Sequence, residues 1–273
     1  MSSEAGMTVT PAGEAGSRPG SGIPEDAEPM PGTGISPVVW MLPERPARGP
    51  KPAHSRDEIA AAAIKIADAD GLDAVTMRRV AAAVGCGTMT LYRYVPTKDH
   101  LLDLIADVTA GEIELPALSG DWRADLREIA CLQRALLMRH PWLAGLQSSR
   151  PSFGPNTLRN VEHGFSILDN LGLTIDEMMI MLNSLMAYVL GVAVGQLAEQ
   201  EAQRRTGLTA EQWQAWMSPY VRKLMATGQY PMFNRIIADA ALPHRENSAE
   251  EGFRLGLERI LDGIAAGLPA DAG

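Results

Sequence analysis

Two short helix-forming segments separated by a Gly-Cys-Gly break constrain the fold of this 273-residue chain more than any other feature. The segment at 77–84 carries small apolar residues on one face, and the segment at 88–94 follows after Gly85 and Gly87. Glycine adopts backbone conformations that other residues avoid, so these two residues permit a sharp turn. Two short helices joined by such a turn form a helix-turn-helix.

The rest of the chain also has helical patterning, with almost no alternation typical of strands. Apolar residues make up 46% of the chain and aromatic residues only 5%, while Ala, Leu and Met, which favour helices, are abundant. We therefore expect an all-α protein. The expected helices lie at about 56–70, 77–84, 88–94, 98–112, 121–139, 142–147, 157–171, 175–205, 210–227, 232–242 and 249–267.

Helix starts are marked by side chains that can accept hydrogen bonds from free backbone N–H groups. Ser55–Glu58, Thr209–Gln212 and Ser248–Glu251 each have the spacing of a capping box. Thr76 and Thr97 are expected to cap the second and fourth helices.

The net charge of −9 is unevenly distributed, and its distribution matters more than its sum. Residues 1–40 have a net charge of −4, residues 41–98 of +3, and residues 99–273 of −8. Such polarity suits a protein that presents one end to DNA. We expect a disordered extension with a basic arm at 1–53, a helix-turn-helix domain at 54–112, and a larger helical domain at 113–273.

The outward side of the third expected helix is rich in hydroxyl groups and aromatic rings. It carries Thr88, Met89, Thr90, Tyr92, Arg93 and Tyr94, and Arg78 begins the preceding helix. Hydroxyl and guanidinium groups bind phosphates and base edges, and the second helix of such a pair fits the major groove. The alternative is an ordinary helix hairpin in an all-helical domain.

Residues 57–108 resemble the DNA-binding domain of the tetracycline-repressor (TetR) family. The residues that carry the resemblance are Ile59–Ala69, Gly71, Leu72, Thr76–Ala81, Gly85–Val95, Lys98, Leu101 and Leu102. The resemblance implies DNA contacts by Arg78, Thr88, Thr90, Tyr92, Arg93, Tyr94 and Lys98. It also implies a homodimer held by the helices at 175–205 and 249–267.

A looser resemblance, to actinomycete efflux-pump repressors of the simocyclinone type, covers most of 39–267. It is carried by Val39–Met41, His140–Ala144, Gly154–Arg159 and Tyr230–Phe233. It implies that a basic N-terminal arm enters the minor groove, a role that Arg45, Arg48 and Lys51 fit. A solvated linker is the alternative for this segment.

Several side chains of the larger domain are candidates for binding a small-molecule inducer. Methionines cluster beside polar groups near the middle of the helix at 175–205, a combination found in small-molecule sites. The predicted ligand-binding residues are Trp142, Phe165, Met178, Asn183, Ser184, Met186 and Tyr188. Ordinary core packing is the alternative for this set. His163 fits either a ligand contact or a helix histidine with a satisfied hydrogen bond.

Other functional classes find little support. The chain has no P-loop, zinc-protease or serine-hydrolase motif, so we expect no enzyme, no cofactor and no metal site. Cys86 and Cys131 suggest no disulfide framework. The uncharged run at 178–198 is long enough to span a membrane, but acidic flanks and internal polar residues favour a core helix. Without a secretory signal, we expect a cytoplasmic protein with no membrane partner.

The hypothesis is a homodimeric regulator that binds a palindromic double-stranded DNA operator and is released by a small hydrophobic inducer. We expect it to repress an efflux-pump or secondary-metabolite gene. Ligand binding would move the helix at 98–112 and change the spacing of the recognition helices, which must match about 35 Å of DNA. An activator of the same architecture, or a ligand-binding helical protein with vestigial DNA binding, remains open.

Overall fold

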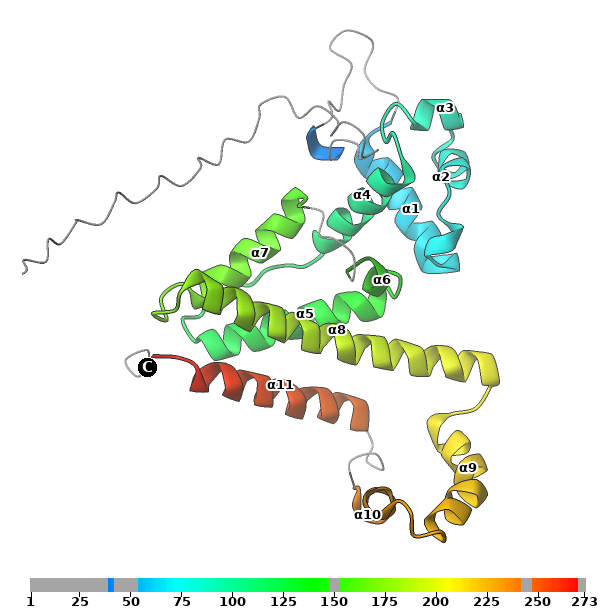
Figure 1. The fold of residues 1–273 in the computed structure, drawn as a ribbon. Coiled ribbons are helices and arrows are strands. Elements are labelled where there is room, and N and C mark those ends of the chain that lie inside the picture. The colour runs from blue at the N-terminus through cyan, green and yellow to red at the C-terminus, as the bar shows by residue number, and fades with distance from the viewer. Residues whose placement is uncertain (1–38, 42–53, 148–152, 242–246, 270–273) are drawn as a thin grey trace, which may run out of the picture. The chain divides into compact units, whose positions relative to one another are not determined.

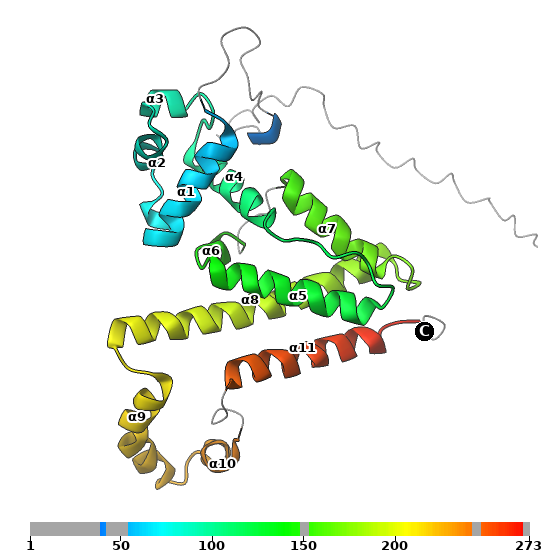
Figure 2. The same ribbon diagram turned by 180° about the vertical axis from the view of Figure 1, so that it is seen from behind.

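A computed structural model describes residues 39–41, 54–147, 153–241 and 247–269, and within these ranges every regular element is helical (Figures 1 and 2). The expected all-α fold is therefore confirmed. The short 3-10 helices are η1 (Val39–Met41) and η2 (Leu72–Ala74). The α-helices are α1 (Arg56–Asp70), α2 (Met77–Val84), α3 (Thr88–Leu91), α4 (Lys98–Ala110), α5 (Trp122–Arg139), α6 (Leu143–Gln147), α7 (Pro155–Leu168), α8 (Ile175–Thr206), α9 (Ala210–Met225), α10 (Pro231–Asp239) and α11 (Ser248–Ala266).

Most expected helices are confirmed to within a few residues, but the third is shorter than expected. Helix α3 ends at Leu91, and residues 92–94 continue as hydrogen-bonded turns in which Tyr94 N donates to Leu91 O at 2.9 Å. Pro96 follows closely, and the residue before a proline avoids helical backbone angles. Helix α7 starts two residues early because Pro155 occupies its first turn, where a missing N–H costs nothing.

Two of the three capping boxes expected from the sequence are present, and the third is not. The capping boxes Ser55–Glu58 and Thr209–Gln212 are confirmed. The third is wrong, because Ser248 is already inside α11 and Asn247, in the left-handed region at φ 61°, precedes it without a side-chain cap. A capping box needs its serine just outside the helix.

Helices α1 to α4 form a small bundle around fully buried side chains. Ile59, Val80, Leu91 and Ile105, one from each helix, have no exposed surface. Arg56 Nε donates to Tyr94 O at 3.2 Å and so joins the start of α1 to the turn after α3. Helix α4 packs along α1 and also contacts α6 and α7. It therefore belongs to the bundle and at the same time contacts the larger set of helices.

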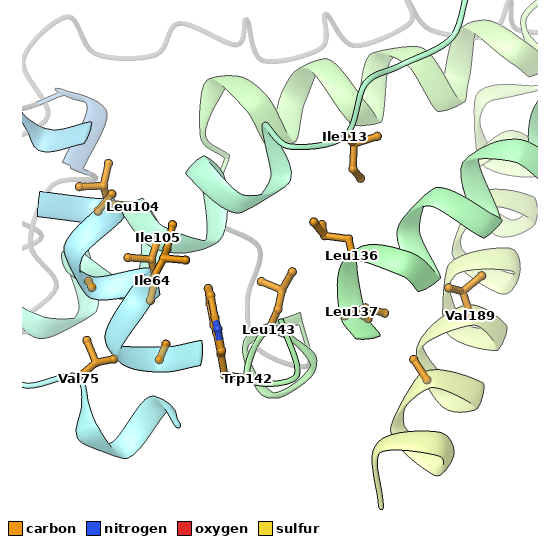
Figure 3. Close-up of a cluster of buried hydrophobic side chains, with 14 of the residues drawn as sticks. Ile64, Val75, Leu104, Ile105, Ile113, Leu136, Leu137, Trp142, Leu143 and Val189 are labelled. Carbon is orange, nitrogen blue, oxygen red and sulfur yellow. The ribbon is translucent and has the colours of Figure 1, made fainter. Parts of the chain in front are cut away.

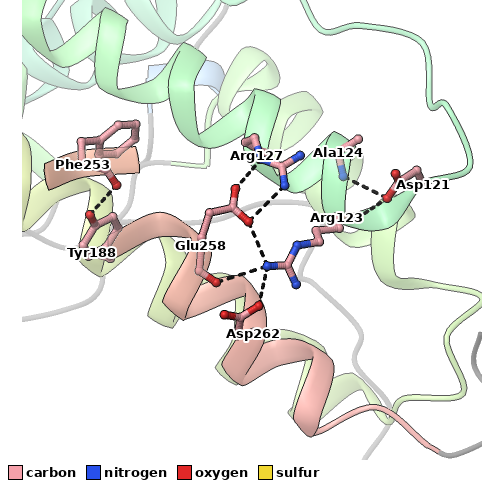
Figure 4. Close-up of polar contacts among 8 residues, drawn as sticks. All are labelled: Asp121, Arg123, Ala124, Arg127, Tyr188, Phe253, Glu258 and Asp262. Atoms are coloured by element: carbon pink, nitrogen blue, oxygen red, sulfur yellow. Dashed lines mark hydrogen bonds and ion pairs between the residues drawn. The ribbon is translucent and has the colours of Figure 1, made fainter. Parts of the chain in front are cut away.

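Helices α5 and α11 are joined by ion pairs (Figure 4). Glu258 of α11 accepts from Arg127 Nε at 2.6 Å and from an Arg123 nitrogen at 2.8 Å, and Asp262 accepts from Arg123 at 2.5 Å. The bonds from the two arginines, Arg127 first, lower the pKa of Glu258 from its ordinary value to about 2. The carboxylate form of Glu258 therefore stabilises the fold.

We expect the Glu258→Gln variant to be less stable than wild type at neutral pH. Because the pKa is lowered on folding, the stabilisation is fully present above about pH 4.5 and is lost as the pH falls toward 2. The side chain is 28% exposed, so we expect only about 1 kcal/mol, or about 2–4 °C in Tm.

Thermal unfolding of both proteins between about pH 7 and pH 3 measures this difference. The Glu128→Gln variant, at an exposed position of α5, the helix that carries Arg123 and Arg127, is the control and should match wild type throughout. A difference for Glu258→Gln that stays constant down to pH 3 would contradict the assignment.

Helix α8 is a core helix, as the sequence favoured, along one of its faces. One stripe, Met178, Leu182, Leu185, Val189 and Ala193, packs inside the protomer against α5, α7 and α11. The helix is apolar and long enough to cross a membrane, but only 22% of its most apolar window is buried inside this chain. Residues beside this stripe, such as Met186 and Tyr188, are partly buried, and the side of α8 that carries Ala187, Gly191 and Val194 is open to solvent in a single protomer.

Helices α9 and α10 pack mainly on each other, beyond the far end of α8 (Figures 1 and 2). They expose large apolar side chains: Trp213, Trp216, Tyr220, Tyr230, Met232, Phe233, Ile236 and Ile237.

Candidate DNA-binding site and regulatory domain

The helix-turn-helix is built by α2, the turn at Gly85–Gly87, and α3. Thr76 caps α2 by accepting from Arg79 N at 3.3 Å. Gly85 ends α2 with φ at 83°, a left-handed conformation that side chains disfavour, and its N–H returns to the last turn of α2. Leu91 is fully buried and fixes α3 against the bundle. The turn and this anchor therefore set the angle at which α3 leaves the domain.

The side chains predicted to contact DNA lie on the outer side of this unit. Met89 is 78% exposed and Tyr92 is 41% exposed. Arg78, Arg93 and Lys98 are also exposed. Thr88, Thr90 and Tyr94 are half-buried. The outer side of α3 and of the turn that follows it thus combines hydroxyl groups, an aromatic ring and the guanidinium group of Arg93.

Three of these cations differ in their ion pairing from the neighbouring Arg79. Arg78, Arg93 and Lys98 have no acidic partner within the described ranges, whereas the neighbouring Arg79 is paired with Asp70. In a chain of net charge −9 such unpaired cations favour an anionic partner. DNA contact by these residues stays a prediction. Arg45, Arg48 and Lys51 lie outside the described residues.

The segment η1, which ends just before that arm, packs on the contact between α4 and α7. Val39 is fully buried. A Cβ on Gly154 would lie 2.5 Å from Trp40 Cζ2 and 2.3 Å from Asp107 Oδ1, so only glycine allows this close approach. The sequence singled out Val39–Met41 only as part of a resemblance, and nothing in its pattern indicated where it would pack.

An aspartate of α4 caps helix α7. Asp107 is almost completely buried and accepts from Thr157 N at 2.8 Å and from Asn156 N at 3.3 Å. Gly154 at the N-cap position has no side chain to do this. The first turn of α7 is therefore stabilised by the last helix of the DNA-binding bundle.

A second polar link joins the bundle to the start of α6, and we call Asp68, Glu112, His140 and Trp142 the interdomain cluster. Asp68 Oδ1 of α1 lies 2.7 Å from His140 Nδ1 and accepts from Trp142 Nε1 at 2.7 Å. The other ring nitrogen of His140 lies 3.1 Å from a carboxylate oxygen of Glu112. Both His140 and Trp142 are buried. Trp142 lies between Ile64 and Leu143 in Figure 3, so apolar packing surrounds this link.

The seven side chains predicted to bind a ligand do not form one wall. Trp142 belongs to the interdomain cluster. Tyr188 donates to Phe253 O at 2.7 Å and stacks on the Phe253 ring, which joins α8 to α11 (Figure 4). Its hydroxyl group is therefore already used in holding the two helices together.

Two more of the predicted ligand residues lie on the outside of the protomer. Asn183 and Ser184 are exposed, and Ser184 Oγ donates to Ile180 O of its own helix at 2.7 Å. The run of methionines suggested one lined face, but α8 turns these two residues away from its buried stripe. Met178 is buried, and Phe165 and Met186 pack against the core. A ligand contact by these three stays a prediction.

The family models and relatives agree on what this architecture is. The model "Bacterial regulatory proteins, tetR family" matches residues 59–105, and "Tetracyclin repressor-like, C-terminal domain" matches residues 115–268. This chain belongs to the TetR family. Regulators of this family bind DNA and small molecules and act as dimers.

The TetR-family chain is 44% identical over 230 residues to the HTH-type transcriptional repressor DrrR1 of Streptomyces coeruleorubidus, covering 83% of each protein. Among solved structures it resembles ActR of Streptomyces coelicolor, both apo and in complex with actinorhodin. The complex has a TM-score of 0.67 and 28% identity, and covers 82% of this chain and all of ActR. These relatives are regulators, which agrees with the expectation that the chain is not an enzyme. Within the described ranges no three acidic, His or Cys side chains gather as a metal site.

Proposed function

We propose that this protein is a transcriptional repressor that binds a palindromic operator as a homodimer. The observation that supports it most directly is the exposure of Tyr92 and Arg93 in the turn after α3, together with the exposed cations Arg78 of α2 and Lys98 of α4, which have no acidic partner in the described part of the chain. Similarity to DrrR1, a repressor, favours repression over activation. An efflux-pump or secondary-metabolite gene is the proposed target, and the cytoplasm is the proposed location.

The Arg93→Ala variant should lose specific operator binding while its fold stays intact. A lost base or phosphate contact costs about 1–3 kcal/mol, which is about 5- to 150-fold in affinity. Because Arg93 is exposed and has no acidic partner within the described ranges, Tm should not change. Tyr92→Ala should behave alike.

Fluorescence anisotropy with operator DNA selected from the flanking promoter measures this effect. Arg205→Ala, which removes an exposed arginine near the end of α8, is the matched control and should bind as wild type does. Wild-type affinity in both recognition-helix variants would refute the proposed DNA-binding surface.

We also propose that a small, largely apolar molecule releases the operator. ActR has been solved with actinorhodin bound, which supports a small-molecule site in a domain of this shape. Helix α4 is the proposed connection, because Asp107 binds the start of α7 and the interdomain cluster joins α1 to α6. A ligand that shifts these contacts changes the spacing of the two recognition helices, which must match about one turn of DNA. A coupling of about 1–3 kcal/mol between the sites is sufficient.

The proposed dimer surface is the outer side of α8 together with α11. Ala187, Gly191 and Val194 form an exposed stripe of small or apolar side chains on α8, opposite its buried stripe. Small residues allow two helices to approach closely, and burial of apolar surface stabilises association. The same burial explains why a soluble protein of this family would carry so apolar a helix.

A further inference from the structure

The imidazole ring of His140 has a carboxylate at each of its two nitrogens. Nδ1 lies 2.7 Å from Asp68 Oδ1 of α1, and Nε2 lies 3.1 Å from a carboxylate oxygen of Glu112, which follows the end of α4 by two residues. The two contacts therefore join α1 and the end of α4 to one side chain of the larger domain. His163 differs, because its Nε2 is buried without a hydrogen-bond partner in the described part of the chain. The expectation of a satisfied helix histidine is not met at that nitrogen.

The backbone on both sides of His140 holds the ring in place. His140 directly follows α5, and its N–H donates to Leu136 O at 2.9 Å. Its carbonyl oxygen accepts from Leu143 N, the first residue of α6, also at 2.9 Å. The side chain is only 6% exposed. The end of α5 and the start of α6 thus fix the ring between the two carboxylates.

Four charged groups face one another at this point when the ring is protonated. Besides Asp68 and Glu112, Arg139 of α5 forms an ion pair with Glu112 at 2.8 Å. Helix α6 contributes no titratable side chain, and Arg159 of α7 donates to backbone oxygens just after α4. Two cations then balance two anions, whereas a neutral ring leaves an excess negative charge beside a buried side chain. Such an imbalance costs free energy.

The number of hydrogen bonds that the ring donates depends on its protonation. An ionised carboxylate only accepts, a neutral imidazole carries one N–H, and an imidazolium carries two. Only the protonated ring can therefore donate to Asp68 and Glu112 together. After loss of one proton we expect Nδ1 to keep its N–H, because its contact with Asp68 is the shorter one. The lone pair of Nε2 then faces Glu112 without a proton between them.

We propose that His140 is a proton-dependent clamp on α4. The imidazolium form holds α1 and the end of α4 at the same time, and loss of the proton releases Glu112 and with it the end of α4. Histidine is the side chain that ordinarily titrates between about pH 5 and pH 8, so this range is the one to test. Since α4 is the proposed connection to operator release, release becomes easier as the pH rises. That consequence rests on the proposed function, whereas the clamp itself does not.

Hydrogen exchange at the end of α4 measures the clamp in the full-length protein without DNA or ligand. The N–H groups of residues 111–113 donate to backbone oxygens in the last turn of α4, and their exchange reports local opening. After correction for the intrinsic effect of pH on exchange, their protection should be about tenfold lower at about pH 8 than at about pH 6, because a hydrogen bond between charged groups is lost.

Glu112→Gln is the decisive variant, because an amide can accept from a protonated Nε2 and donate to a neutral one. Protection at the end of α4 should then be equal at the two pH values. Glu114→Gln removes an exposed carboxylate two residues later and is the matched control, which should keep the wild-type pH dependence. Arg139→Gln removes the other partner of Glu112 and should also keep it, because both ring contacts remain.

Nitrogen NMR of the histidine rings in isotope-labelled protein tests the clamp directly, and the His140→Gln variant assigns the signals. Both ring nitrogens of His140 should carry a proton in the clamped form, and only Nδ1 should keep one at high pH.

Three results would overturn the proposal: a ring that loses the Nδ1 proton first, wild-type protection that does not change with pH, or an equal change in Glu112→Gln and wild type. Operator binding at one fixed pH tests the proposed function separately. A protein that shows the clamp but binds no operator DNA would contradict the repressor and leave the clamp intact.

Discussion

The Gly191→Glu variant should be a monomer and should lose at least about 100-fold in operator affinity. Gly191 lies on the exposed stripe of α8, and a Cβ built there meets no atom of its own chain within 4 Å. The substitution is therefore harmless to the protomer, and replacing a mid-helix glycine stabilises a helix by about 0.5–1 kcal/mol. In a two-fold symmetric interface the same charge enters twice, and an unpaired buried charge costs several kcal/mol.

Sedimentation velocity and operator binding measure the two consequences of this substitution. The structure makes Gly191 a better test site than Ala193, which is buried inside the protomer. The Val161→Glu variant adds the same charge at an exposed apolar position of α7 and should remain dimeric. A dimeric Gly191→Glu protein would place the interface elsewhere. Because dissociation alone lowers Tm, damage to the protomer is recognised instead by a loss of helical circular-dichroism signal at room temperature.

The second large effect is expected for Asp68→Ala, which removes the acceptor at the centre of the interdomain cluster. His140 Nδ1 and Trp142 Nε1 both lie 2.7 Å from the same oxygen, so the variant leaves two buried groups unpaired. Each costs about 1–3 kcal/mol, and Tm should fall by about 4–15 °C. The link between α1 and α6 is also lost, so an inducing compound should change operator affinity much less than in wild type.

Asp68→Asn is the matched variant, because its side-chain oxygen can replace Oδ1 as the acceptor while the charge is removed. If Asp68→Asn keeps a near-wild-type Tm and still releases operator DNA when the inducing compound binds, while Asp68→Ala loses both properties, the hydrogen bonds account for the effect. If the inducing compound releases operator DNA from Asp68→Ala as it does from wild type, the interdomain cluster does not couple the two domains.

The DNA-binding unit was the most predictable part of the molecule because its signals are local. A glycine with φ at 83° ends α2, and Thr76 caps its start, and both could be inferred from residue type and spacing. Periodicity likewise located α4, α5, α7, α8 and α11, because each buries side chains repeated every three or four residues. Helices α9 and α10 bury no residue in this chain, although their sequences are amphipathic.

The arrangement of the side chains predicted to bind a ligand could not be inferred in the same way, since it depends on contacts between distant segments. The methionine-rich run of α8 predicts one wall, yet Met178 is buried and Ser184 is exposed. The Tyr188 hydroxyl group donates a hydrogen bond to Phe253 O, which lies 65 residues later in the chain. No local pattern indicated that Asp68 would meet Trp142, 74 residues later.

The cap that Asp107 places on α7 also sets an energetic threshold for switching. Loss of a helix cap costs about 0.5–2 kcal/mol, comparable to the coupling of about 1–3 kcal/mol that release requires. Any molecule that moves α4 away from α7 must offset this cost before it weakens operator binding. Weakly bound, non-cognate compounds would then occupy the domain without changing transcription, so a single carboxylate filters inducers by how strongly they bind.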